Sequence, residues 1–491
     1  MKLHRTRSTH LEDRGAHRTV LAGMMHWSER RRGFIGAILT TALASLVLMA
    51  GCCGGPRCCN EGTGDVRSQV GDPGASGSRS VRPQTGTSSA GEGDVLFSVR
   101  APKLVPVQRR VRETFPLRNY VFFNEGSQDV PNRYVILTKD EAASFSEAEL
   151  QEIVPKNMVG RAERQMAVYY NILNILGDRM RTNPGSAVSL SGATGNGSEE
   201  GRALAETVKS YLVNVFGIDG ARITTEGRDK PRVPSEHPGG TQELSLLRAE
   251  DRRVDIESRS PELLMQVGGP PDMLRPVYIY AVQEDPMDGR VLFQVSGAKE
   301  VLSSWSLELT DEQGTVQRYG PYVREQESVA GRTILGNRAE GDFKVVMLGT
   351  TKGGSPVRRE SSVYLVRRDE TVPEGLRFSI LFEFDKSKTI DTYKSFLTEM
   401  VAPLVPEGGH VIIHGHTDVI GDVDYNQTLS DDRAQGARSV INGALSESVT
   451  RGVTFDTYGF GEDAGWAPFD NNLPEERFYN RTVIIDFVPG S

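Results

Sequence analysis

Cysteine is nearly absent from this 491-residue chain. Four cysteines lie within eight residues of one another, and none follows them: Cys52, Cys53, Cys58 and Cys59. The rest of the chain therefore cannot hold a disulfide framework, a cysteine-ligated metal core or a cysteine nucleophile.

Acidic residues outnumber basic ones in most of the chain. The net charge is −8, but residues 1–51 carry eight Lys and Arg against three Asp and Glu, so the remainder carries −13. A protein that binds nucleic acid neutralises phosphates with basic side chains. We therefore expect no nucleic-acid partner.

Long hydrophobic runs are also missing, with one exception near the N-terminus. Residues 33–50 are uncharged and mostly apolar, and they follow Arg30-Arg31-Arg32. These flanks are typical of a secretory signal peptide. The segment ends in Leu48-Met49-Ala50-Gly51-Cys52, which resembles the lipobox of bacterial lipoproteins. The resemblance implies that residues 1–51 are a lipoprotein signal peptide and that Cys52 carries lipid, palmitate included.

A lipid on Cys52 predicts attachment to the cell outer membrane, because the sorting rules of Gram-negative lipoproteins favour it when the next residue, here Cys53, is not Asp. The folded domains would then face the periplasm. Two alternatives stay open: an uncleaved membrane anchor, and a metal site at the four cysteines. The true start (Met1, Met24 or Met25) and the leaflet orientation are also open.

Residues 52–94 are rich in Gly, Ser, Thr, Pro and charge, which predicts a flexible linker after the lipidated Cys52.

The C-terminal region alternates strand and helix patterns. Apolar residues recur at helical spacing from Tyr393 to Leu404 and again from Leu429 to Leu445. Short apolar runs predict four strands, at 378–384, 411–413, 452–458 and 482–488. Residues 376–491 are therefore expected to form a βαβαββ α/β sandwich.

Five separated loop motifs in this region resemble the OmpA-like peptidoglycan-binding domain family in order and spacing. They include Phe382-Glu383-Phe384-Asp385, Gly415-His416-Thr417-Asp418, Leu429-Ser430-Asp431-Asp432-Arg433-Ala434, Tyr458-Gly459-Phe460-Gly461-Glu462 and Asn480-Arg481-Thr482-Val483, with Gly421 and Asn426 between them. The resemblance covers 376–488. It implies non-covalent binding of the diaminopimelate residue in the peptidoglycan stem peptide.

The resemblance also assigns roles to residues. Asp418 would accept the diaminopimelate ammonium, and Arg433 would bind its carboxylate, for which a planar guanidinium suits better than an ammonium group. Asn426 is expected as a helix cap and loop contact. The remaining residues assigned to the peptidoglycan-binding site are Thr417, Asp385 and Arg481. The family usually has a second Arg where Thr482 stands.

Two structural alternatives compete with this assignment. Asp418 and Arg433 could simply pair with each other as a surface ion pair, which contributes about 0–1 kcal/mol. His414 and His416 lie two apart on a strand and could share a metal, but no third ligand is close in sequence. We therefore expect no metal and no cofactor.

Residues 95–260 are interpreted as a degenerate OmpA-like domain. The segment 118–258 repeats the strand and helix order of the C-terminal region, with Gly195 where Asp418 stands and Leu204 where Arg433 stands. Such a copy should not bind diaminopimelate in the family's way. The alternative is two unrelated α/β domains.

Residues 270–368 read as all-β, with strand patterns near 277–280, 291–295, 305–309, 341–347 and 362–366. Their spacing suggests an immunoglobulin-like β-sandwich. The expected fold class is multidomain α+β: two OmpA-like βαβαββ α/β sandwiches flanking an all-β immunoglobulin-like sandwich.

Two functional hypotheses follow. In the first, the chain is an outer-membrane lipoprotein that binds peptidoglycan and tethers the membrane to the cell wall. In the second, it is a wall-anchored scaffold of an envelope, secretion or motility complex that recruits protein partners through 95–370. We expect no enzyme, because no catalytic triad order, phosphate loop or paired glycosidase carboxylates stands out. The partners, the oligomeric state and the roles of the first copy and of the β-sandwich stay open.

Overall fold

A computed structural model describes residues 95–106, 108–152, 161–236, 243–263, 273–284, 286–368, 374–383, 390–447 and 450–489. The predicted signal peptide, Cys52 and the linker lie outside these residues, as does Asp385. Within them, no helix combines the length and apolar character that crossing a membrane would require.

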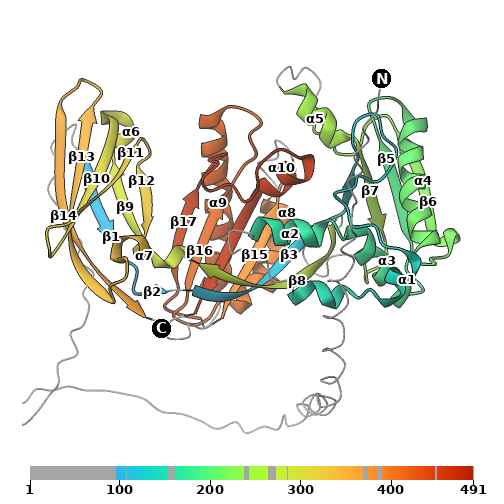
Figure 1. Ribbon diagram of the computed structural model, residues 1–491, viewed down its shortest axis with the longest axis horizontal. Coiled ribbons are helices and arrows are strands. Elements are labelled where there is room, and N and C mark those ends of the chain that lie inside the picture. Colours follow the sequence, from blue (N-terminus) through green and yellow to red (C-terminus); the bar gives the residue numbers. More distant parts are fainter. Residues whose placement is uncertain are drawn as a thin grey trace, which may run out of the picture. The chain divides into compact units, whose positions relative to one another are not determined.

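The C-terminal α/β copy has the strands and helices expected from the sequence. Its strands are β15 (Gly375–Leu381), β16 (His410–Gly415), β17 (Thr454–Gly459) and β18 (Thr482–Val488), in the order β17-β16-β18-β15 (Figure 1). Its helices are α8 (Ile390–Ser395), which continues as a π-helical and a 3₁₀ turn to Leu404, and α9 (Val423–Ser446). A further helix, α10 (Pro474–Asn480), precedes β18 and was not expected.

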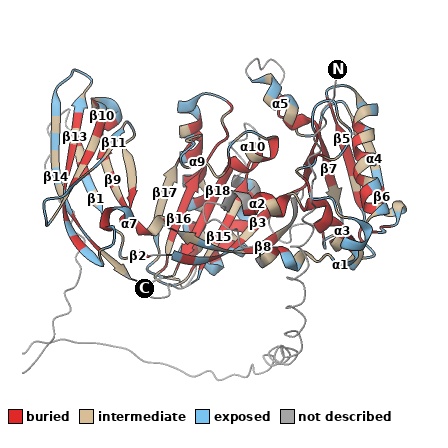
Figure 2. Cartoon of the chain, in the orientation of Figure 1, coloured by how far each residue is buried: buried red, intermediate tan, exposed pale blue. Residues whose placement is uncertain are grey.

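The centre of this sheet forms the core. β18 is buried at all seven positions because it lies between β16 and β15, and Figure 2 shows the buried residues concentrated in these strands. At Gly415 the strand lies against α9, since a Cβ there would be 2.2 Å from the carbonyl oxygen of Ser430. This close approach fixes how near α9 lies to the end of β16.

Two more strands extend the same sheet. β3 (Gln108–Arg118) pairs in parallel with β15, and β8 (Met273–Glu284) pairs antiparallel with β3, giving six strands. Both segments were assigned elsewhere from the sequence: β3 to the first copy, and the strand at 277–280 to the β-sandwich. Their alternating patterns predict strands correctly but do not specify which sheet a strand joins.

The first α/β copy lies between β3 and β8 in the chain. Its strands are β4 (Tyr120–Phe122), β5 (Val188–Ala193), β6 (Ile223–Arg228) and β7 (Arg253–Ser258), in the order β4-β7-β5-β6. Its helices are α1 (Lys139–Ser144), α2 (Arg161–Tyr169), α3 (Ile172–Thr182), α4 (Ser198–Asn214) and α5 (Leu244–Asp251). The strand order and the pairing directions match those of β15, β18, β16 and β17.

The remaining strands form a three-stranded and a five-stranded sheet around a separate hydrophobic core. The first contains β1 (Leu96–Arg100), β9 (Arg290–Ser296) and β12 (Gln326–Ala330). The second contains β11 (Val316–Tyr322), β10 (Leu302–Asp311), β13 (Glu340–Thr351), β14 (Pro356–Arg368) and β2 (Val105–Pro106). Residues 95–106 therefore join this β-sandwich rather than the first copy. Its immunoglobulin-like topology stays a prediction.

The two α/β copies share one hydrophobic core. Tyr169 of the first copy packs against Tyr479 of α10 with ring centroids 5.2 Å apart, and Tyr120 of β4 packs against Phe478 at 5.8 Å. The hydroxyl of Tyr479 donates to the carbonyl oxygen of Pro116 at 3.0 Å and accepts from the N–H of Arg118 at 3.1 Å. The copies are thus joined by buried contacts and not only by the chain.

Candidate functional site

A pocket of about 80 Å³ opens at the end of β16, against the start of α9. It is lined by Thr417, Asp418, Ile420, Gly421, Tyr425, Asn426, Leu429, Arg433 and Arg481. Five of the six peptidoglycan-binding residues predicted from the sequence therefore line one pocket. The sixth, Asp385, lies outside the described residues.

Asp418 is the buried anion of this pocket, with 2% of its surface exposed. Its Oδ1 accepts a hydrogen bond from the Ile420 N–H at 3.2 Å, and its Oδ2 accepts one from Nη1 of Arg481 at 2.5 Å. Burial raises the pKa of Asp418, and this effect exceeds the opposing one of Arg481. Asp418 is thus ion-paired with Arg481. The surface ion pair considered as an alternative from the sequence had Arg433 in this role.

Arg433 is the buried cation on the α9 side of the pocket, with 2% exposure. Its guanidinium carbon lies 4.3 Å from the centre of the Phe382 ring, a cation–π contact that fixes the plane of the group. The carbonyl oxygen of Phe382 accepts from Nε of Arg481 at 3.2 Å. Phe382 therefore positions both arginines that line the pocket.

Asn426 holds the loop that carries Asp418, but it does not cap the helix. Its Nδ2 donates to the carbonyl oxygens of Asp418 (3.4 Å) and Ile420 (3.2 Å) and to the carboxylate of Glu462 (2.6 Å). The N-cap is Asp422, which accepts from two backbone N–H groups in the first turn of α9. The expected loop contact is therefore present, whereas the expected cap role was wrong because α9 begins at Val423, three residues before Asn426.

Thr417 contributes a buried hydroxyl to the pocket. Its N–H donates to the carbonyl oxygen of Gly461 at 2.9 Å, and its side chain is 2% exposed. The Oγ1 atom has no hydrogen-bond partner among the residues that the structure describes. An unsatisfied buried hydroxyl costs about 1–3 kcal/mol, so it marks a position where a ligand group could bind.

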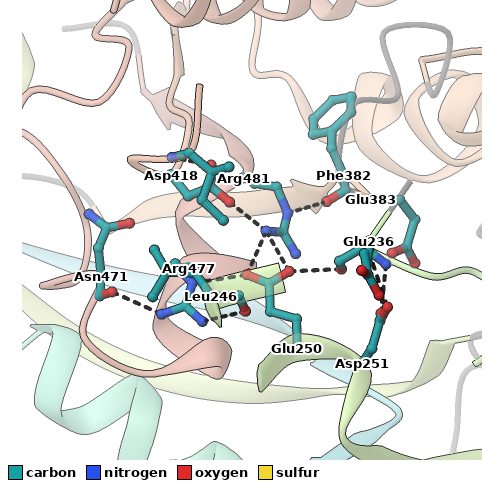
Figure 3. Close-up of polar contacts among 12 residues, drawn as sticks. Glu236, Leu246, Glu250, Asp251, Phe382, Glu383, Asp418, Asn471, Arg477 and Arg481 are labelled. Atoms are coloured by element: carbon teal, nitrogen blue, oxygen red, sulfur yellow. Dashed lines mark hydrogen bonds and ion pairs between the residues drawn. The ribbon is translucent and has the colours of Figure 1, made fainter. Parts of the chain in front are cut away.

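Glu250 completes the charge network and was not identified from the sequence. It lies near the end of α5 in the first copy, and its carboxylate accepts from Nε of Arg477 at 3.0 Å and from Nη1 of Arg481 at 3.2 and 3.3 Å (Figure 3). Burial disfavours the charged form of Arg481, but Glu250 and Asp418 outweigh it and raise the pKa of that guanidinium. The sequence around Glu250 contains no local pattern that predicts its contact with Arg481, which is 231 residues away.

The first copy lacks counterparts of Asp418 and Arg433. Gly192 and Gly415 pair with equivalent neighbours, Gly227 and Val254 in one copy and Gly459 and Val483 in the other. Counting three residues onward gives Gly195 opposite Asp418.

The same comparison of the helices places Leu204 opposite Arg433, because Gly201 and Ser430 are the residues that contact the two equivalent glycines. The arginine before the last strand is kept: Arg252 stands opposite Arg481 and pairs with Glu200 of α4 at 2.7 Å. The first copy therefore keeps the fold and one arginine of the pocket.

His414 and His416 are hydrogen-bonded to each other. Nδ1 of His414 and Nε2 of His416 lie 2.8 Å apart, and both side chains are buried. Within the described ranges, no group of three or more His, Cys, Asp or Glu residues is arranged to hold a metal ion. The metal alternative at this pair thus gains no third ligand.

Comparisons with known proteins agree with the motif resemblance. No family model matches the chain. Part of it is 31% identical over 110 residues to outer membrane porin F of Pseudomonas aeruginosa, which is 22% of this chain and 30% of that protein. Another match is 34% identical over 83 residues to outer membrane protein A of Serratia marcescens, 16% of this chain and 22% of that protein. Each match spans less than a third of the relative.

Solved structures give weaker matches. The peptidoglycan-associated lipoprotein from Burkholderia pseudomallei is 21% identical, with 22% of this chain and 88% of that chain covered and a TM-score of 0.18. The cell wall anchor of the T6SS from Pseudomonas aeruginosa is 20% identical, with 30% and 82% covered and a TM-score of 0.18. The resemblance to OmpA-like domains is confirmed, and it rests on the motifs and the two curated relatives.

Proposed function

We propose that this chain, which contains an OmpA-like domain, binds the diaminopimelate side chain of the peptidoglycan stem peptide without catalysing a reaction. The observation that carries this proposal is that Asp418 and Arg433 line the same pocket. Diaminopimelate ends in an ammonium and a carboxylate on one carbon. A buried anion and a buried cation around a small pocket match such a group in charge.

Other residues around the pocket also support this ligand. The buried Thr417 hydroxyl offers one further hydrogen bond. Asn426 and Phe382 fix the loop and the guanidinium groups in advance, so little conformational entropy is lost on binding.

The proposal extends to membrane attachment. Lipid on Cys52 would anchor the chain in the outer membrane, and the segment 52–94 would let the pocket reach the cell wall. Replacing Cys52 by Ala should abolish palmitate labelling and remove the protein from the outer-membrane fraction. An unchanged distribution would contradict lipid anchoring but not peptidoglycan binding.

Cosedimentation with purified diaminopimelate-type peptidoglycan tests the binding. The experiment uses the full chain, because β3 and β8 belong to the sheet of the C-terminal copy. The wild type should pellet, and Asp418→Ala and Arg433→Ala should stay in solution. Asp432→Ala and Arg438→Ala are matched controls, since both are exposed charges on α9. Equal pelleting of all five proteins would refute the site.

A second role in protein recruitment is favoured by the β-sandwich. It has its own hydrophobic core and contributes no residue to the lining of the pocket. Crosslinking of the full chain in cells would test this role. Adducts that map to 286–368 would support a scaffold, and adducts confined to peptidoglycan would contradict it.

A further inference from the structure

Two carboxylates from different copies meet at one nitrogen atom. Nη1 of Arg481 donates to Oδ2 of Asp418 at 2.5 Å and to both oxygens of Glu250 at 3.2 and 3.3 Å (Figure 3). Glu250 is 1% exposed and is held in place by the Ser235 hydroxyl, which donates to its Oε2 at 2.9 Å. A buried carboxylate with three donors is a fixed part of the structure.

The helix that carries Glu250 lies against the pocket without lining it. The carboxylate of Glu243, at the start of α5, accepts from the N–H of Gly421 on the pocket rim at 3.3 Å. Glu250 lies near the other end of the same helix. None of the nine residues that line the pocket comes from α5. The helix therefore supports the wall of the pocket and leaves its interior open.

The charges around the pocket explain what Glu250 contributes. Arg477 and Arg481 are both ion-paired with Glu250, and Arg481 is also paired with Asp418. Without Glu250, Asp418 would be the remaining direct ion-pair partner of Arg481 among the described residues, and the surroundings of the pocket would be more positive by one charge. A ligand ammonium would then meet a less favourable site.

We infer that Glu250 is a positioning residue for the ammonium end of the ligand: it compensates Arg481 and so leaves the negative charge of Asp418 available. This inference rests on the proposed function. The first copy, which lacks both ligand-binding charges, thereby supplies a carboxylate that the pocket of the second copy needs.

The inference predicts an unusual pair of effects for Glu250→Gln. Binding of a diaminopimelate-containing muropeptide near neutral pH should weaken about tenfold, because the ammonium meets more positive charge. Yet the loss of binding on acidification should move to lower pH. Burial and then the charge of Glu250 raise the pKa of Asp418, so removing that charge lets Asp418 stay ionised further into the acid range.

Other charged groups face this network and belong in the interpretation of the pH profile. Arg433 faces Asp418 from α9, and Arg477 faces Glu250 from α10. Asp251 lies beside Glu250 on α5, Glu383 acts on Arg481 from the end of β15, and Glu462 is bonded to Asn426. All of them are common to the wild type and the variant, so a difference between the two profiles reports on Glu250.

Calorimetric titration of the full chain with the purified muropeptide, from pH 4 to 8, tests this. Glu475→Gln is the matched control: Glu475 is a fully buried carboxylate between the two copies, paired with Arg133, and it contacts neither Asp418 nor Arg481. Ser235→Ala removes one hydrogen-bond donor to Glu250 but keeps its charge, so it should weaken binding to a smaller extent without the pH shift, and it serves if Glu250→Gln fails to fold.

The outcomes separate the two proposals. Weaker binding with a shift to lower pH in Glu250→Gln, but not in Glu475→Gln, would support the inference. Binding by the wild type that is unchanged in Glu250→Gln and Ser235→Ala would overturn it and leave the proposed function intact. Equal losses in Glu250→Gln and Glu475→Gln without a pH shift would also overturn it, as a general effect of the interface. A wild type that does not bind at any pH would refute the proposed function and this inference with it.

Discussion

Gly192 of β5 and Gly415 of β16 are equivalent residues of the two α/β copies. A Cβ on Gly192 would lie 1.9 Å from the carbonyl oxygen of Gly201 in α4, and a Cβ on Gly415 would lie 2.2 Å from that of Ser430 in α9. At these glycines each strand therefore touches its helix through backbone atoms. In the second copy this contact sets the position of Arg433, one turn further along α9.

Gly415→Ala should consequently destabilise the chain and damage the pocket. Real Cβ atoms do not approach a carbonyl oxygen this closely, so β16 or α9 must move, at a cost of about 3 kcal/mol. Chemical denaturation measures this cost. Gly443→Ala is the control, because this exposed glycine of α9 has open space around it and the substitution should stabilise by roughly 0.5–1 kcal/mol. Similar effects of the two substitutions would contradict the packing argument.

Arg433→Lys should weaken binding of diaminopimelate-type peptidoglycan by about tenfold. A lysine keeps the charge but loses the planar pair of donors that matches a carboxylate, and it loses the stacking on Phe382. Arg438→Lys provides the comparison, since Arg438 lies on the same helix over the ring of Phe455 at 5.7 Å and is no part of the pocket lining. Cosedimentation at several protein concentrations gives both affinities, and equal affinities would argue against a guanidinium-specific contact.

The buried pair of Arg377 and Asp486 predicts a pH-dependent stability. Burial works against ionisation of Asp486, but Arg377 outweighs it and holds the pKa of this carboxyl well below its usual range. A lowered pKa contributes stability above the ordinary pKa of the carboxyl, and this contribution is lost as the pH falls towards the folded value.

Arg377→Met leaves Asp486 buried without its main partner, so we expect a loss of about 3–5 kcal/mol at pH 7. The loss should shrink as the pH falls, because burial favours protonation of Asp486 once Arg377 is gone. Unfolding by urea at pH 7 and at pH 3.5 measures both values. A loss that is the same at the two pH values would indicate lost packing instead of lost charge compensation.

Much of the C-terminal copy could be predicted from its sequence because its signals are local. Helical spacing between Tyr393 and Leu404 and the short apolar runs depend on neighbours along the chain. The motif loops lie at strand ends, and strand ends of one sheet meet at one edge, which is why the predicted site residues converge. Even α10 has a local signal that was overlooked, namely Pro474 followed by Glu475 and Glu476 in its first turn.

The features that could not be predicted depend on contacts between distant segments. A strand pattern shows that 277–280 is extended, but the choice between two sheets is made by packing. Glu250 lies 231 residues from Arg481 in sequence, and its neighbours form an ordinary amphipathic helix. Its role is visible only when the two copies are seen to share one core.

That shared core predicts how the chain unfolds. The two α/β copies and the six-stranded sheet contain one continuous hydrophobic cluster, and the β-sandwich contains another. Segments that share a core unfold together, so calorimetry of the full chain should show two transitions, one for both copies and one for the sandwich. Three transitions, with one for each copy, would contradict a common core.

Two substitutions assign the transitions. Tyr479→Phe removes the hydroxyl that bonds Pro116 and Arg118, and it should lower only the α/β transition, because losing these two buried hydrogen bonds costs about 1–3 kcal/mol. Leu309→Ala leaves a cavity in the core of the β-sandwich and should lower only the other transition, by about 2–5 kcal/mol. If Tyr479→Phe shifted both transitions, the β-sandwich would be coupled to the copies more strongly than its separate core implies.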